Sequence, residues 1–480
     1  MTSLVSLVSI ALLARVLTKE DYATYRQAIL AYTFAVPFVT LGLDRALYYF
    51  LPSDQPNARI TLLTNLLLLT GAGAALTLFM ACGGNYFLAA RFHNPCLASA
   101  LLLLSPYPVL MLPASAVSAC LMAQQQVDRL TAYTIISRIV LLLTVMGPAV
   151  YYATPDSAIA GTVIGAILTT PAALYLMIKA CPGPTRFPSR AGLLRQLHFS
   201  VPLGLAGMVG TTSLQMGHML VAASLPPSAF ASYSVGATEV PFIGMVTGAI
   251  TSVLLVDYAR LYQAGDTAAL IALLHRAMSK SAAILLPVMT LLLIIAPDLM
   301  ECMFGSRYRD SASYFRVLLL LLPVRTITFG AVLQAMGLSR HVLCSALLGL
   351  ASVTCLCYLT IREFGAIGAA WATVLSTYGI VVPYLMWVLK HYLYVSCAAM
   401  FPWRRIARLA LMSCVVGLPT YLLHGNLSLG VFYRIAATSA LFVVSTLVAY
   451  TITGDFRLQA ILSFSRRTLG LPERSTINGR

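Results

Sequence analysis

The stretch LTKEDYATY, residues 17–25, decides the fold because the chain contains a second version of it. Residues 225–233, LPPSAFASY, repeat its Leu, aromatic, Ala, hydroxyl and Tyr positions at an offset of 208 residues. The same offset aligns AIA at residues 158–160 with AIG at residues 366–368. Both matches connect corresponding apolar segments of the chain. We therefore expect an internal repeat, and a chance match in a biased composition is the alternative.

The composition indicates a membrane protein. The 480 residues are 59% hydrophobic and 10% charged, with a mean hydropathy of +0.85. Soluble proteins are about 45–50% apolar and about 25% charged, so this chain could not cover the surface of a soluble fold. The ten cysteines show no C-x-x-C pair and no zinc spacing, and we interpret them as buried thiols. The composition thus excludes a soluble fold, a disordered chain, a coiled coil and a secreted disulfide scaffold.

Apolar segments long enough to span a bilayer recur along the whole chain. A spanning helix needs about 20 mostly apolar residues. No segment alternates polar and apolar residues as membrane β-strands do. We predict an all-α polytopic membrane protein with about fourteen spans, near residues 2–17, 28–50, 60–82, 97–123, 131–152, 157–178, 199–222, 233–256, 281–297, 312–336, 341–361, 366–389, 406–423 and 431–452.

The repeat predicts how these spans are grouped. Six spans per repeat is an even number, so both copies have the same orientation and are related by an axis along the membrane normal. We expect two pseudo-symmetric six-helix lobes around a central cavity, plus two C-terminal helices. The expected divisions are an N-lobe (1–180), a cytoplasmic linker (181–198), a C-lobe (199–392), the extra helices (393–455) and a basic cytoplasmic tail (456–480).

The distribution of basic residues predicts the orientation. The chain has 31 Lys and Arg against 15 Asp and Glu. With both termini in the cytoplasm, nineteen of the basic residues lie in inside loops and the tail, and eight lie in outside loops. This asymmetry follows the positive-inside rule. The basic residues at the cytoplasmic face are expected to contact anionic membrane lipids, which accounts for the positive net charge. No nucleic-acid partner is therefore expected.

Residues 266–280 predict an amphipathic segment before the ninth span. Asp266 is a suitable N-cap, and apolar residues follow it at helical spacing. We interpret the segment as a cytoplasmic interfacial helix. An early extension of the ninth span is the alternative.

Four short motifs resemble those of a known family. They are ARVLTKEDYATY (14–25), GLDRAL (42–47), FGSRY (304–308) and GAIGAAWAT (365–373). In this order they resemble the bacterial polysaccharide-transport proteins, which include the O-antigen and exopolysaccharide flippases. That family belongs to the multidrug/oligosaccharidyl-lipid/polysaccharide exporter superfamily. The resemblance extends over about residues 5–390.

The resemblance implies a two-lobed, V-shaped bundle that works by alternating access. Members of the family move undecaprenyl-diphosphate-linked oligosaccharides across the bacterial inner membrane. The implied partners are the lipid-linked glycan, membrane lipids and the polysaccharide polymerase machinery. No enzymatic activity and no cofactor are implied.

Three arginines within the predicted spans are candidates for binding the diphosphate. Arg45 lies near the cytoplasmic end of the second span, Arg138 lies in the fifth, and Arg325 lies near the middle of the tenth. A charge inside a span is costly, so it usually faces a cavity or a partner. Arginine binds phosphate oxygens with a planar fork and keeps its proton. The alternative is a structural role in pairing or snorkelling.

Two acids are candidates for coupling transport to an ion. Glu239 is the only glutamate inside a predicted span, and Asp44 adjoins Arg45. Either could bind H⁺ or Na⁺, the coupling ions we consider. Glu239 could instead pair with an arginine across the cavity. His218, near the outer end of the seventh span, is expected to have a packing role.

The sequence also limits the competing functions. It has no Gly-Lys pair, and hence no P-loop, and no Asp-x-Asp spacing for a metal-dependent glycosyltransferase. A drug or cation antiporter would need buried acids, and this chain has more buried arginine. A flippase for the peptidoglycan lipid precursor is a further alternative. A membrane polymerase or ligase is less favoured, because the outside loops are short.

Overall fold

The computed structural model describes residues 2–53, 57–184 and 188–453, and within them every regular element is helical. The first half contains α1 (Thr2–Val16), α2 (Lys19–Thr40), α3 (Leu43–Ser53), α4 (Ala58–Phe79), η2 (Met80–Gly84), α5 (Asn85–Arg91), α6 (Cys96–Leu104), α7 (Tyr107–Ser115), α8 (Val117–Ala123), α9 (Val127–Tyr152) and α10 (Pro155–Ala180). The second half contains α11 (Arg190–Ser224), α12 (Pro227–Gly236), α13 (Pro241–Gln263), α14 (Thr267–Phe304), η3 (Ser306–Ser311), α15 (Ala312–Leu319), η4 (Val324–Thr326), α16 (Phe329–Ala335), α17 (Ser339–Phe364), α18 (Ala366–Ser376), η5 (Thr377–Val381) and α19 (Val382–Leu393). After these come η6 (Cys397–Met400), α20 (Trp403–Asn426) and α21 (Val431–Ile452).

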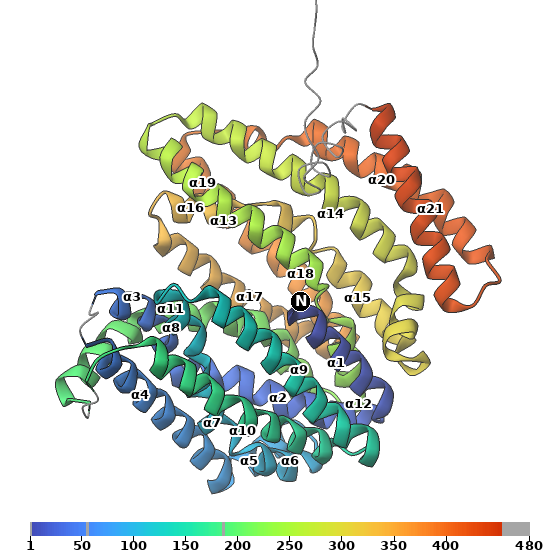
Figure 1. Cartoon of the computed structure of the whole chain (residues 1–480). Helices are drawn as coiled ribbons and strands as arrows, with labels where there is room; N and C mark the ends of the chain where they lie inside the picture. Colours follow the sequence, from blue (N-terminus) through green and yellow to red (C-terminus); the bar gives the residue numbers. More distant parts are fainter. Residues whose placement is uncertain (1, 54–56, 185–187, 454–480) are drawn as a thin grey trace, which may run out of the picture.

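The helices form two bundles (Figure 1). Most helices of the first half lie together at the bottom of the view, and those of the second half lie above them. Within the bundles, α9 packs against α10 and α17 packs against α18. The two bundles meet where α2 contacts α11 and α12, and where α1 contacts α13 and α14. α11 begins at Arg190, inside the segment expected to be a linker, and the expected tail lies outside the described residues.

The repeated stretches of the sequence face each other at this junction. One lies at the start of α2 and the other at the start of α12, and these two helices pack together. Their aromatic and Ala positions are almost fully buried: Tyr22, Ala23, Phe230, Ala231 and Tyr233. The second match occupies the first turns of α10 and α18. The repeat therefore marks equivalent places in two similar units.

Several predicted spans are broken helices. α2 and α3 are bent by 43°, the pair 96–104 and 107–123 by 51°, and the pair 306–319 and 324–335 by 44°. At the first break, Leu41 and Gly42 have positive φ angles of 44° and 75°. At the third, Pro323 precedes η4 and lacks the backbone N–H that would continue the helix. The breaks expose backbone and place side chains away from a regular helical face.

Every predicted span overlaps a helix or a broken helix pair, but the count of fourteen is not confirmed. Within the described residues, eight helices are long and apolar enough to cross a membrane, or up to eleven if each bent pair is one span. The predicted spans 2–17, 199–222 and 233–256 coincide with α1, α11 and the α12–α13 pair, which are not among them. The all-α membrane fold itself is confirmed.

The prediction of an interfacial helix at residues 266–280 is wrong. Asp266 does cap the helix, because its carboxylate accepts a hydrogen bond of 2.8 Å from the backbone N–H of Ala269. However, α14 continues without a break for 38 residues, about 57 Å. Its apolar stripe, Leu270, Leu274 and Met278, is fully buried in a cluster with residues of α13, α16 and α19. The stripe therefore covers protein, as an early extension of the ninth span.

A buried ion pair anchors the C-terminal helices α20 and α21 to α14. The Asp298 side chain is 3% exposed and accepts hydrogen bonds from Nε and Nη2 of Arg434, the latter at 2.6 Å. His424 Nε2 lies 3.4 Å from the same carboxylate, and its Nδ1 lies 2.9 Å from Thr438 Oγ1. Removing one member of a buried pair is costly, because the other charge is left without its partner.

We expect Arg434→Ala to destabilise the protein by about 3–5 kcal/mol, because Asp298 would stay buried without a counter-charge. The matched control is Arg362→Ala, because Arg362 bonds only Tyr358 of its own helix among the contacts described. The measurement is the thermal melting temperature of the detergent-purified protein. Equal melting temperatures for the two variants would contradict the anchor, and Asp298→Asn combined with Arg434→Gln should recover part of the loss.

Candidate functional site

A cavity of about 870 Å³ lies where the two halves meet. Its walls come from α2, α11, α15, α17 and α18, together with the break between α12 and α13 and the break at η4. Most of the lining is apolar. The polar lining side chains include Thr33, Gln215, His218, Thr238, Glu239, Arg325 and Ser376. A central cavity between two lobes was predicted from the repeat, and it is present.

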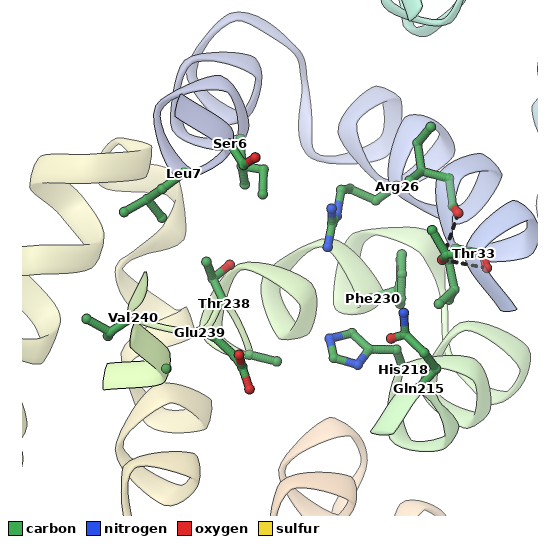
Figure 2. A pocket seen from close by; sticks show the side chains of 15 residues that line it. Ser6, Leu7, Arg26, Thr33, Gln215, His218, Phe230, Thr238, Glu239 and Val240 are labelled. Atoms are coloured by element: carbon green, nitrogen blue, oxygen red, sulfur yellow. Dashed lines mark hydrogen bonds between the residues drawn. The ribbon is translucent and has the colours of Figure 1, made fainter. Parts of the chain in front are cut away.

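A second cavity of about 580 Å³ adjoins the first (Figure 2). It is lined by residues of α1, α2, α11 and α12 and by the start of α13. Seven residues line both cavities, including Gln215, His218 and Glu239. The two cavities therefore lie side by side between the halves and share part of their lining. The His218 ring packs edge-on against Tyr233 at 5.3 Å, which agrees with the expected packing role.

The structure brings two of the predicted site residues together. Arg325 Nη2 donates a hydrogen bond of 2.5 Å to Glu239 Oε1. Glu239 lies in the non-helical turn between α12 and α13, and Arg325 lies in η4, so each residue sits at a helix break. The Arg325 side chain is 38% exposed and that of Glu239 is 71% exposed. The pair is therefore accessible from the cavity rather than sealed in a core.

Arg26 is a cavity residue that was not among the residues predicted from the sequence. It lies on α2 and lines the smaller cavity, and Figure 2 shows its guanidinium extending from that helix into the space. Its Nε is buried and has no hydrogen-bond partner in the described part of the chain. The sequence prediction placed it in an outside loop because the second span was expected to begin at residue 28, whereas α2 begins at Lys19. An N-cap signal was present: the Thr18 side chain accepts from the Asp21 N–H.

The other predicted site residues lie outside the lining of the two cavities. Arg138 is exposed on α9, and its Nη1 is 3.5 Å from Oγ of Ser6, which lines the smaller cavity. Arg45 and Asp44 lie on α3 beyond the bend. The guanidinium of Arg45 is close to Gly207 on α11, where an added Cβ would lie 3.4 Å from Nη1. Arg138 thus borders the site, and Arg45 and Asp44 are separate from it.

Polar contacts also tie the halves together at the end where α1 turns into α2. We call this set of contacts the outer latch, because the Lys and Arg distribution predicts that this end faces the outside. Lys19 Nζ lies 3.1 Å from Asp310 Oδ2 and donates to Ser232 Oγ at 3.1 Å. The outer latch further includes Arg15 donating to the carbonyls of Met303 and Cys302, and Arg307 Nη1 donating to Leu17 O at 2.8 Å.

The fold is similar to those of several solved transporter structures. A structure of the lipid II flippase MurJ in an inward closed conformation matches with a TM-score of 0.76 and 16% identity, covering 94% of this chain and 96% of that one. An inward-facing multidrug resistance MATE transporter of the MOP superfamily matches with a TM-score of 0.66 and 13% identity, covering 83% and 95%. A MOP superfamily transporter from Pyrococcus furiosus matches with a TM-score of 0.56 and 14% identity, covering 82% and 93%.

The family itself is shown by the sequence. The pattern of the family described as "Polysaccharide biosynthesis protein" matches residues 12–313, more than half of the chain. The protein therefore belongs to this family of polysaccharide biosynthesis proteins, which confirms the resemblance seen in its motifs. A comparison with curated proteins gives no significant match.

We expect Lys19→Ala to loosen the outer latch. The Lys19 and Asp310 side chains are 28% and 55% exposed, and a pair at such exposure contributes about 0.2–1 kcal/mol, up to about a fivefold change in opening. The measurement is the labelling rate of Ser311→Cys, a buried position next to Asp310, by a membrane-impermeant thiol reagent in a chain without its native cysteines.

The matched control is Lys280→Ala, which removes a lysine from α14 away from this end. The charge-exchanged variant Lys19→Asp with Asp310→Lys should restore slow labelling. Labelling as slow in Lys19→Ala as in the control would show that the pair does not hold the halves together.

Proposed function

We propose that this protein flips undecaprenyl-diphosphate-linked oligosaccharide repeat units, precursors of O-antigen or exopolysaccharide, across the bacterial inner membrane by alternating access. The observation that carries the proposal is the charge of the cavity between the halves. Among the described residues that line the two cavities, Arg26 and Arg325 are cationic and Glu239 is anionic. The cavity thus has one arginine more than it has carboxylates.

An excess of arginine suits an anionic cargo. A charge held away from bulk water needs a partner, and the diphosphate of a lipid-linked glycan would supply it. The guanidinium group binds phosphate oxygens in a fork and does not lose its proton. A cationic drug would meet net repulsion in the same cavity. The charge balance therefore favours the flippase over a drug or cation antiporter.

A flippase for the peptidoglycan lipid precursor is the second candidate. It is supported by the similarity in fold to the lipid II flippase MurJ over 94% of the chain. Lipid-linked precursors of both kinds present a diphosphate on a polyprenyl chain, so the arginines would serve either one. The family match favours a polysaccharide precursor. Rescue of a strain that lacks its lipid II flippase, compared with rescue of a strain that lacks its O-antigen flippase, separates the two.

In this proposal the protein is a transporter without enzymatic activity or cofactor. Both termini would face the cytoplasm, and polysaccharide polymerase machinery would consume the flipped units and draw transport forward. Glu239 is the better placed of the two candidate acids for coupling to H⁺ or Na⁺, because it lines the cavity and Asp44 does not. In vesicles with labelled lipid-linked glycan, we expect translocation without any new glycosidic bond.

We expect Arg325→Ala to reduce translocation in such vesicles by about tenfold or more, because a hydrogen bond to a charged group contributes about 1.5–3 kcal/mol. Arg26→Ala should have a comparable effect. Arg362→Ala, at an exposed position in the last turn of α17 that does not line either cavity, serves as the control at equal protein level. Unchanged translocation in both cavity variants would refute the assignment of the cavity as the cargo site.

A further inference from the structure

We propose that the Glu239 carboxylate occupies, in the empty cavity, the place on Arg325 that a phosphate of the cargo takes during transport. Glu239 is then a competitor built into the chain, and cargo binding is an exchange of one anion for another. This inference rests on the proposed function, because it requires an anionic cargo. It adds an account of how the site selects an anionic cargo and of what cargo binding changes in the protein.

The contact between the two residues has the geometry that a phosphate would use. A guanidinium offers its N–H groups in one plane, and carboxylate and phosphate oxygens accept from them in the same way. Glu239 occupies Nη2 of Arg325 at 2.5 Å. Both side chains line the 870 Å³ cavity, so an incoming anion can reach the arginine from the side on which the glutamate is bound.

The exposure of the pair allows the exchange. A fully buried pair would be held by the cost of leaving either charge alone in low dielectric. Here the Glu239 side chain is 71% exposed, so water can solvate its carboxylate once it leaves Arg325. A pair of this kind is weak, and a diphosphate with more negative charge than a carboxylate can displace it.

Arg26 supplies the first contact for the cargo in this exchange. It lines the adjoining cavity, and its buried Nε has no partner in the described part of the chain. Glu239 lines both cavities, so an anion held by Arg26 lies in the space that Glu239 borders. Figure 2 shows Arg26 extending from α2 and Glu239 from the turn between α12 and α13. A diphosphate bound between the two arginines would repel the carboxylate and favour its release.

The exchange has a structural consequence because both partners lie at helix breaks. Glu239 belongs to the turn that connects α12 to α13, and Arg325 belongs to η4 between α15 and α16. While the pair is formed, it links these two breaks across the cavity. Cargo binding would remove that link between the two breaks, while α13 keeps its packing on α16. Recognition of the anion and release of the contact between the breaks would then be the same event.

The test is the binding of inorganic pyrophosphate to the purified full chain in detergent, by equilibrium dialysis at fixed pH and ionic strength. We expect Glu239→Gln to bind about two- to fivefold more tightly than the unaltered chain, because the competitor is gone. Glu239→Asp should also bind more tightly, because the shorter side chain keeps the negative charge and loses the contact with Arg325. If charge repulsion alone were responsible, Glu239→Asp would bind like the unaltered chain.

A double-mutant cycle completes the test. In an Arg325→Gln background, Glu239→Gln should no longer improve binding, because the site of competition is absent. An improvement that persists in this background would overturn the exchange.

The outcomes separate the exchange from the proposed function. Pyrophosphate binding that depends on Arg325 and is unchanged by both Glu239 variants would refute the exchange and leave the anionic cargo supported. Binding that is unchanged by Arg325→Gln and Arg26→Gln would refute the cavity as an anion site, and the proposed function with it.

Discussion

The structure depends on one electrostatic constraint: a guanidinium in a membrane protein needs hydrogen-bond acceptors beside it, and a buried one needs an anion. The chain meets this constraint in three ways. Arg434 has the buried carboxylate of Asp298, and Arg15 and Arg307 have backbone carbonyls of the opposite half. In the two adjoining cavities the constraint is met incompletely, because the described lining residues include two arginines, Arg26 and Arg325, and one carboxylate, that of Glu239. The first two arrangements hold helices together, and the incomplete one creates a demand for a further anion.

The breaks in the helices place these charges. A continuous α-helix would satisfy its own backbone and present Arg325 and Glu239 on regular faces, whereas Pro323 and the non-helical turn before Pro241 interrupt the helices beside these residues. A similar irregularity separates α2 from α3, where Leu41 and Gly42 adopt positive φ angles. There α11 crosses so closely that a Cβ at Gly204 would overlap the backbone of Leu41. The halves therefore touch backbone to backbone at this crossing and through polar side chains at the outer latch, with the cavity elsewhere along the same junction.

Much of the fold was predictable because it depends on local composition. Apolar length located the spans, and the repeat at 208 residues predicted two similar units around a central cavity. That the repeated stretches pack against each other was not predicted and is seen in the contact of α2 with α12. Arg325 and Glu239 were identified because a charge inside an apolar segment is conspicuous. Arg26 was missed because a rule based on apolar content discards the polar first turns of a helix, and α2 begins nine residues before the predicted span. The partnership of Lys19 with Asp310 joins residues 291 apart, and no local signal encodes such a distance. The apolar stripe on α14 was predicted to contact lipid, whereas it contacts protein. Helical periodicity shows that one face is covered and does not show whether lipid or protein covers it.

The anchor of α20 and α21 has an evolutionary consequence. These two helices pack on α14 and on each other, and Arg434 and His424 both reach the carboxylate of Asp298. A chain that lost α20 and α21 would keep the Asp298 carboxylate on α14 turned toward hydrocarbon. Loss of the two helices would therefore be tolerated only together with a neutral residue at position 298. Within this family, a relative without these two helices would have to differ at that position as well as in length. The acid and the appended hairpin are thus expected to be gained or lost together.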